Sequence, residues 1–144
     1  MESKTFKLSR RAAYYETDQM GIIHHSNYIR YFEETRIEFM YSLGCDIQKM
    51  EDVGIIIPNV DAYAKYIKPI RFHDEFEIEA KITYFNGVKM KIEYTIRFTD
   101  TGEISATGFT THCTVNSDMK PISIKRTHPE FYNILKEAVC NTEE

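Results

Sequence analysis

Hydrophobic and polar residues alternate through the middle of the chain, which is the pattern of strands with one buried face. The run 76–84 has an apolar side chain at every second position, and the run 88–98 repeats the pattern. Asn86-Gly87 between them is a strong two-residue turn signal, so the two runs are predicted to form a β-hairpin. The residues expected to face inward are Phe76, Ile78, Ala80, Ile82 and Tyr84, then Val88, Met90, Ile92, Tyr94, Ile96 and Phe98.

Three further strands and a short helix are predicted outside this hairpin. A first strand covers 6–15, with Phe6, Leu8, Ala12 and Tyr14 on one side, and a β-rich segment covers 55–66, broken by Pro58. A second turn at 100–102 leads into a strand from 103 to about 116. A short amphipathic helix is expected over 129–139, followed by a polar tail at 141–144.

The segment 26–43 changes to helical spacing. Tyr28, Phe32 and Phe39 recur at intervals of three or four with Thr35, and a second apolar stripe runs beside them. A helix that is apolar over so much of its circumference must be nearly surrounded by protein. Ser26 or Asn27 is expected to cap its N-terminus, and Gly44 to end it.

The element order gives a fold class. A strand, a long buried helix and four strands joined by hairpins require antiparallel pairing with one face of the sheet covered. We therefore expect an α+β fold, with an antiparallel sheet wrapped around one long central helix. The length of 144 residues, without repeats or linkers, predicts one domain over 1–144.

The amino-acid composition limits which classes of binding partner and which cellular location are expected. The net charge of −4 argues against a nucleic acid as the binding partner. The sequence contains no run of about 18 apolar residues, so no membrane-spanning helix is predicted. The basic N-terminus has no apolar stretch behind it, so no secretory signal is predicted. Cys45, Cys113 and Cys140 are odd in number and widely spaced, which favours reduced thiols and a cytoplasmic location.

Candidate chemistry lies in the segment 14–36. It holds the pair Thr17-Asp18, Gly21 three residues after the aspartate, His25 seven after it, Asn27-Tyr28, and the Glu-x-x-Arg spacing of Glu33 and Arg36. This string resembles the hot-dog-fold acyl-CoA thioesterases of the 4-hydroxybenzoyl-CoA thioesterase type, including the bacterial enzymes associated with the Tol-Pal system. The strand order predicted above matches that fold over nearly the whole chain.

The resemblance implies hydrolysis of an acyl thioester to a carboxylic acid and a free thiol. Asp18 would be the catalytic carboxylate, either as a general base on water or as a nucleophile that forms a mixed anhydride. The backbone N–H of His25 would bind the oxyanion, at the positive end of the helix that begins there. The leaving thiol has a reference pKa near 8.5, so one carboxylate and one donor suffice chemically.

Each of these residues also has a plainer interpretation. Asp18 alone would be taken for a turn or capping carboxylate, and the side chain of His25 could be inert while its backbone acts. Glu33 and Arg36 are interpreted as a structural ion pair. Glu34 is an alternative carboxylate, because one branch of hot-dog thioesterases uses a helical Glu. His24 is expected to be a solvated neighbour.

The resemblance also implies the residues that bind substrate. Gly21 would let the loop approach the acyl carbonyl. Tyr28 would line the acyl pocket together with Ile57, Pro58 and Asn59, which a neighbouring subunit could supply; the alternative is that these four residues are only core or dimer contacts. Lys89, after the hairpin turn, is the candidate for the CoA phosphates. The turn itself lacks the basic cluster of some relatives, so the substrate can be an acyl-CoA or an acyl-carrier-protein thioester.

Two other functions remain open. A catalytically silent acyl-CoA-binding protein would bind the substrate without turnover, and an acyl-thioester hydratase or dehydratase would need a second His-containing motif, which the sequence lacks. The five histidines have no metal-ligand spacing, and no cofactor is implied. A homodimer or homotetramer, with active sites between subunits, is expected from the family.

Overall fold

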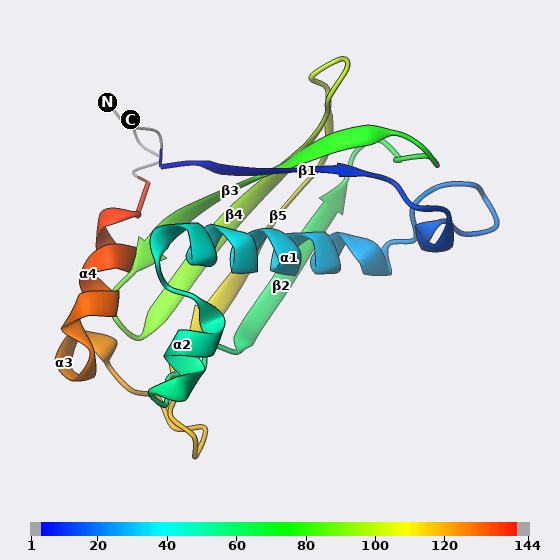
Figure 1. The fold of residues 1–144 in the computed structure, drawn as a ribbon. Helices are drawn as coiled ribbons and strands as arrows, with labels where there is room; N and C mark the ends of the chain where they lie inside the picture. Colours follow the sequence, from blue (N-terminus) through cyan, green and yellow to red (C-terminus); the bar gives the residue numbers. More distant parts are fainter. Residues whose placement is uncertain (1–3, 141–144) are drawn as a thin grey trace.

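A computed structural model describes residues 4–140, and the expected tail at 141–144 lies outside this range. Five strands and a long helix form the body of the fold, in the predicted order (Figure 1). The elements in chain order are β1 (Phe6–Arg11), the 3-10 turn η1 (Tyr14–Glu16), α1 (Ser26–Leu43), α2 (Ile47–Asp52), β2 (Asn59–Tyr66), β3 (Glu75–Phe85), β4 (Lys89–Phe98), β5 (Ile104–Cys113), α3 (Ile124–Thr127) and α4 (Pro129–Glu137).

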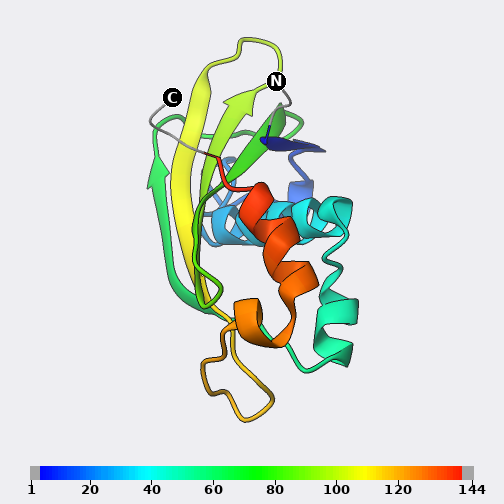
Figure 2. The ribbon, with the colours of Figure 1, turned by 90° about the vertical axis from the view of Figure 1, so that its left-hand side faces the viewer.

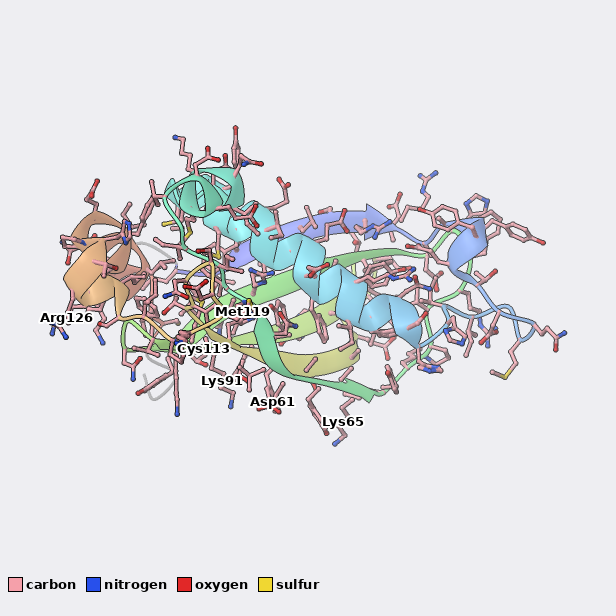
Figure 3. The ribbon with its side chains drawn as sticks, turned by 90° about the horizontal axis from the view of Figure 1, so that it is seen from below. Asp61, Lys65, Lys91, Cys113, Met119 and Arg126 are labelled. Carbon is pink, nitrogen blue, oxygen red and sulfur yellow. The ribbon has the colours of Figure 1, made fainter. Side chains whose placement is uncertain are left out.

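The sheet is antiparallel throughout, in the order β1-β3-β4-β5-β2. The helix α1 lies across one face, and α2, α3 and α4 lie on the same side of the sheet (Figure 2). The α+β fold with a central helix is therefore confirmed. The opposite face carries polar side chains, and Figure 3 shows Asp61, Lys65 and Lys91 pointing away from α1.

The helix and the sheet approach each other closely at Gly108 of β5. A Cβ atom at this position would lie 2.3 Å from the carbonyl oxygen of Tyr63 and 2.5 Å from Cε2 of Phe32. The space that glycine leaves lets Phe32 stack on Tyr94, with ring centroids 4.4 Å apart. The predicted inner residues of β4 from Met90 to Phe98 are all buried.

The N-terminus of α1 differs from its prediction. Ser26 and Asn27 are the first two helical residues, and His25 is the cap residue, without a side-chain cap hydrogen bond of its own. The ring of His24 takes that place, because its Nδ1 accepts the Ser26 N–H at 3.1 Å. The interpretation of His24 as a solvated neighbour was thus incomplete. At the other end, Gly44 ends the helix in the left-handed conformation, as predicted.

Two predictions about the strand faces were wrong. The first strand ends at Arg11, and Tyr14 lies in η1 with 74% of its surface exposed rather than on the inner side. Tyr84 is half exposed because the pairing of β3 with β4 shifts register between Ile82 and Tyr84. This irregularity turns the neighbouring Phe85 into the core instead.

The remaining boundaries follow the sequence closely. The segment before Pro58 makes an isolated bridge between Ile56 and Val115, and β2 begins at Asn59, as the proline predicted. The sequence did not indicate α2 and α3. No helix within residues 4–140 has the length and apolar character needed to cross a membrane.

Candidate functional site

The loop from η1 to α1 folds back on itself and presents Asp18. Thr17 bridges Ile23, the Asp18 N–H donates to the carbonyl of Ile22 at 2.9 Å, and the Gly21 N–H donates to the carbonyl of Asp18 at 3.0 Å. Gly21 has a φ of +76°, a conformation that only glycine adopts at little cost. The glycine therefore forms the turn that holds Asp18 in place.

A cleft of about 330 Å³ lies beside this loop. Asp18 and His25 both line it, and they are joined by Tyr28 from the first turn of α1. The wall is completed by Met20, Ile22, Ile23, Tyr66, Ile67, Lys68 and Pro69. Three of the residues proposed from the sequence thus meet at one cleft, whose walls are largely apolar.

The carboxylate of Asp18 is held by its own loop. Its Oδ1 accepts the Met20 N–H at 2.8 Å, an Asx-turn contact that fixes the side chain while the carboxylate stays at the cleft. Glu34 does not line this cleft and instead accepts a hydrogen bond from Arg10 at 3.0 Å. Of the two candidate carboxylates, Asp18 therefore lies at the cleft and Glu34 does not.

The His25 N–H lies where α1 begins. Among residues 4–140, no acceptor pairs with this N–H, whereas the N–H groups of Ser26 and Asn27 have partners. Free N–H groups at a helix N-terminus carry the positive end of the helix dipole and bind anions well. The position is therefore suited to hold a developing oxyanion.

Tyr28 forms the buried side of the cleft. Its ring meets Tyr66 edge to face, with centroids 4.9 Å apart. Burial raises the pKa of Tyr28, although contacts with the Ile70 backbone and Ser105 act in the opposite direction. The phenol therefore stays protonated at neutral pH, and this wall of the cleft is uncharged.

Ile57, Pro58, Asn59 and Lys89 do not reach this cleft within one chain. They lie at the other end of the sheet, where Lys89 pairs with Cys113 and the Cys113 N–H donates to the Pro58 carbonyl at 3.3 Å. The eight residues of β2 separate the two ends by roughly 23 Å at 3.3 Å per residue. Lys89 lines a second hollow of about 510 Å³ there, together with Val60 and His112.

The predicted contact between Glu33 and Arg36 is present at 4.0 Å, with Arg36 buried and Glu33 exposed. Within residues 4–140, no three His, Cys, Asp or Glu side chains gather as the ligands of a metal ion would. The three cysteines are free thiols.

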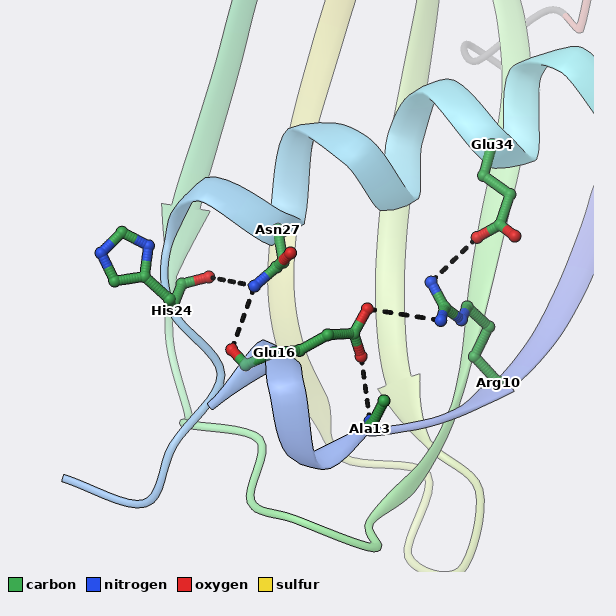
Figure 4. A network of polar contacts seen from close by, with 6 residues as sticks. All are labelled: Arg10, Ala13, Glu16, His24, Asn27 and Glu34. Atoms are coloured by element: carbon green, nitrogen blue, oxygen red, sulfur yellow. Dashed lines mark hydrogen bonds and ion pairs between the residues drawn. The ribbon is translucent and has the colours of Figure 1, made fainter. Parts of the chain in front are cut away.

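Sequence reasoning missed two groups of residues near the cleft. Tyr66, Ile67 and Lys68 come from the end of β2 and the segment after it, and no motif marks them. Lys68 is held by an ion pair with Glu103 at 2.9 Å. The second group is a polar network around Glu16, shown in Figure 4, which includes Arg10 and Asn27. Glu16 and Asn27 stood in the motif segment, but their burial could not be inferred from spacing.

Comparison with known proteins identifies the family. The model of the thioesterase-like superfamily matches residues 13–135, which include the Asp18 loop, α1 and all strands after β1. The chain belongs to the thioesterase-like superfamily. The expected hot-dog fold and the enzyme class of this thioesterase are thereby confirmed.

Individual relatives agree with this family. The acyl-CoA thioester hydrolase YbgC of Escherichia coli O157:H7 is 26% identical over 92 residues, which cover 62% of this chain and 67% of that protein. The structure of a DHNA-CoA thioesterase from Staphylococcus aureus is similar with a TM-score of 0.87 and 29% identity, over 92% of this thioesterase and 89% of that chain. A hypothetical protein from Aquifex aeolicus is 37% identical with a TM-score of 0.80, over 88% and 98% of the two chains.

Proposed function

We propose that this thioesterase hydrolyses acyl-CoA or acyl-carrier-protein thioesters, with Asp18 as the catalytic carboxylate and the His25 N–H as the oxyanion donor. The observation that carries the proposal is the meeting of both groups at one apolar cleft, at the N-terminus of α1. The names of the E. coli and S. aureus relatives support acyl-CoA as the substrate class.

The reaction follows from these two groups. Asp18 accepts a proton from water as the water oxygen bonds to the thioester carbon; alternatively, its own oxygen bonds to that carbon first, and after the thiolate leaves, water hydrolyses the mixed anhydride to the carboxylic acid and free Asp18. The carbonyl electrons move onto oxygen, which the His25 N–H stabilises, and then return to expel the thiolate. Loss of one oxyanion donor typically costs about 3 kcal/mol of barrier, or roughly a hundredfold in rate. The thiolate needs no strong acid, because the reference pKa of a thiol is near 8.5.

A second subunit completes the proposed site. Within residues 4–140, β2 is an edge strand with one unpaired side, and its residue Val60 is 63% exposed. Antiparallel pairing of β2 with its copy across a two-fold axis would extend the sheet and place the Tyr66 end of one strand beside the Asn59 end of the other. Ile57, Pro58 and Asn59 of the partner subunit would then border the Asp18 cleft, with Lys89 of the partner subunit available for CoA phosphates.

The experiment is release of free thiol, followed with Ellman's reagent, from short, long and aromatic acyl-CoAs. The wild type is compared with Asp18→Asn and with Asp46→Asn as a matched control. Asp46 caps α2 and accepts the N–H of the residue two positions later, as Asp18 does, but it lies outside the cleft. We expect turnover by the wild type and by Asp46→Asn, and a loss of at least a thousandfold in kcat for Asp18→Asn.

Other outcomes would contradict the proposal in distinct ways. Turnover that survives Asp18→Asn would refute this carboxylate and direct attention to Glu34. An absence of thiol release by a wild type that still binds acyl-CoA would favour the silent binding protein. Conversion of an unsaturated acyl-CoA to its hydroxyacyl form without thiol release would favour the hydratase.

A further inference from the structure

Residues 16–24 form a closed arch whose two ends meet at Glu16 and His24. The His24 N–H donates to the Glu16 carbonyl at 2.8 Å, and the pairing of Asp18 with Ile22 closes the arch above this bond. Asp18 stands two residues after one end of the arch, and His25 directly follows the other end. The distance between the carboxylate and the His25 N–H therefore depends on how firmly the base of the arch is held.

The side chain of Asn27 lies at this base. Its Nδ2 donates to the Glu16 carbonyl at 3.0 Å and, through a longer contact of 3.4 Å, to the His24 carbonyl (Figure 4). An amide nitrogen has two N–H donors, so one side chain serves both ends of the arch. Asn27 is only 6% exposed, so water cannot readily replace these bonds.

The side chain of Glu16 also makes contacts that hold this residue in place. The carboxylate, 5% exposed, accepts the Ala13 N–H at 2.9 Å and pairs with Arg10 at 3.3 Å. Arg10 also binds Glu34 on α1 at 3.0 Å, so the network joins β1, η1 and α1 (Figure 4). The Glu16 carbonyl is thus a fixed point, and Asn27 is the link from that point to the start of the helix.

We propose that Asn27 is a positioning residue for thioester hydrolysis. By holding the base of the arch, it fixes the distance between the Asp18 carboxylate and the His25 N–H. The proposal rests on the function proposed above. Asn27 does not line the Asp18 cleft, so it acts through these two groups and not on the substrate. A displacement of about 1 Å between reacting groups can cost on the order of a hundredfold in rate. Removal of the amide should therefore lower kcat about ten- to a hundredfold and change KM little, because the cleft walls remain.

The test compares Asn27→Ala with Thr35→Val as a matched control. Thr35 is buried on the same helix, and its hydroxyl donates to the Tyr31 carbonyl at 2.7 Å, but it has no bond to the arch. Both variants thus lose a buried bond from a side chain to a carbonyl. We would measure urea stability, kcat and KM, and amide hydrogen exchange at His24 and Asp18, whose N–H groups close the arch.

We expect Asn27→Ala to have a lower kcat and at least tenfold faster hydrogen exchange at both amides. Thr35→Val should keep the kcat and the exchange rates of the wild type, even if its stability is equal to or lower than that of Asn27→Ala. Asn27→Asp keeps the side-chain shape without N–H donors, and it replaces Asn27→Ala if that variant does not fold. Unchanged kcat or unchanged exchange in the Asn27 variant would overturn the positioning role and leave the proposed function standing. Equal losses of kcat in both variants would overturn it too. A wild type without turnover would refute the proposed function itself.

Discussion

His112 makes the stability of this protein depend on pH in a range that can be calculated from the structure. Its ring is buried, its Nε2 lies 2.8 Å from the Thr110 hydroxyl, and its Nδ1 has no partner among the described residues. Burial, followed by the charge of Arg36, lowers the pKa of His112 to about 3. The folded protein therefore keeps a neutral imidazole at pH values where an unfolded chain takes up a proton.

The sign and the magnitude follow from proton linkage. The unfolded histidine has a pKa near 6.5. The contribution of the neutral His112 to the free energy of unfolding is therefore fully present above pH 6.5 and is lost as the pH is lowered toward 3. The slope within this range is about 1.4 kcal/mol per pH unit. Between pH 7.5 and 4.5 the loss from this one residue amounts to roughly 2 to 3 kcal/mol.

The perturbation that isolates this effect is His112→Gln, which keeps a polar group near Thr110 and does not titrate. Urea unfolding at one protein concentration, from pH 7.5 to 4.5, gives the stability difference between wild type and variant at each pH. We expect the advantage of the wild type to shrink by 2 to 3 kcal/mol over this range. An advantage independent of pH, or an NMR titration of the folded His112 ring near pH 6, would refute the reasoning.

Three further predictions concern packing, assembly and substrate. Gly108→Ala should lower the free energy of unfolding by about 3 kcal/mol in urea melts, because the new Cβ meets a backbone oxygen, and an unchanged melt would contradict the close approach of helix and sheet. Val60→Lys on the edge strand should shift the protein toward monomers in sedimentation velocity, and an unaltered oligomer would argue against pairing through β2. Lys89→Ala should raise KM severalfold for an acyl-CoA but not for the matching acyl-N-acetylcysteamine thioester; an equal effect on both would exclude a phosphate contact.

The candidate site was accessible to sequence reasoning to the extent that it is local. Asp18 and His25 are seven residues apart, and a turn at Gly21 followed by a helix start is enough to bring them to one cleft. Asn27 and Glu16 could be seen in the same segment, but their role depends on burial and on bonds to a carbonyl eleven residues away. Ile57 and Lys89 had no local constraint at all, and within one chain they lie at the far end of the sheet.

The sequence by itself determined the order of the five strands, α1 and α4, but not the short helices α2 and α3, because alternation, helical spacing and turn residues such as Asn86-Gly87 act over a few neighbouring positions. It also determined where α1 ends, since Gly44 adopts a conformation that other residues avoid. Only the tertiary structure decided which side chains the sheet buries at its irregularities: a register shift in β3 exposed Tyr84 and buried Phe85. It likewise decided that the ring of His24 caps α1, that Glu16 and Arg10 pair beside the arch, and that His112 is neutral. The neutral His112 arises from the exclusion of water, and the other contacts depend on the exact backbone path of the loop, which the spacing of residues along the chain does not specify.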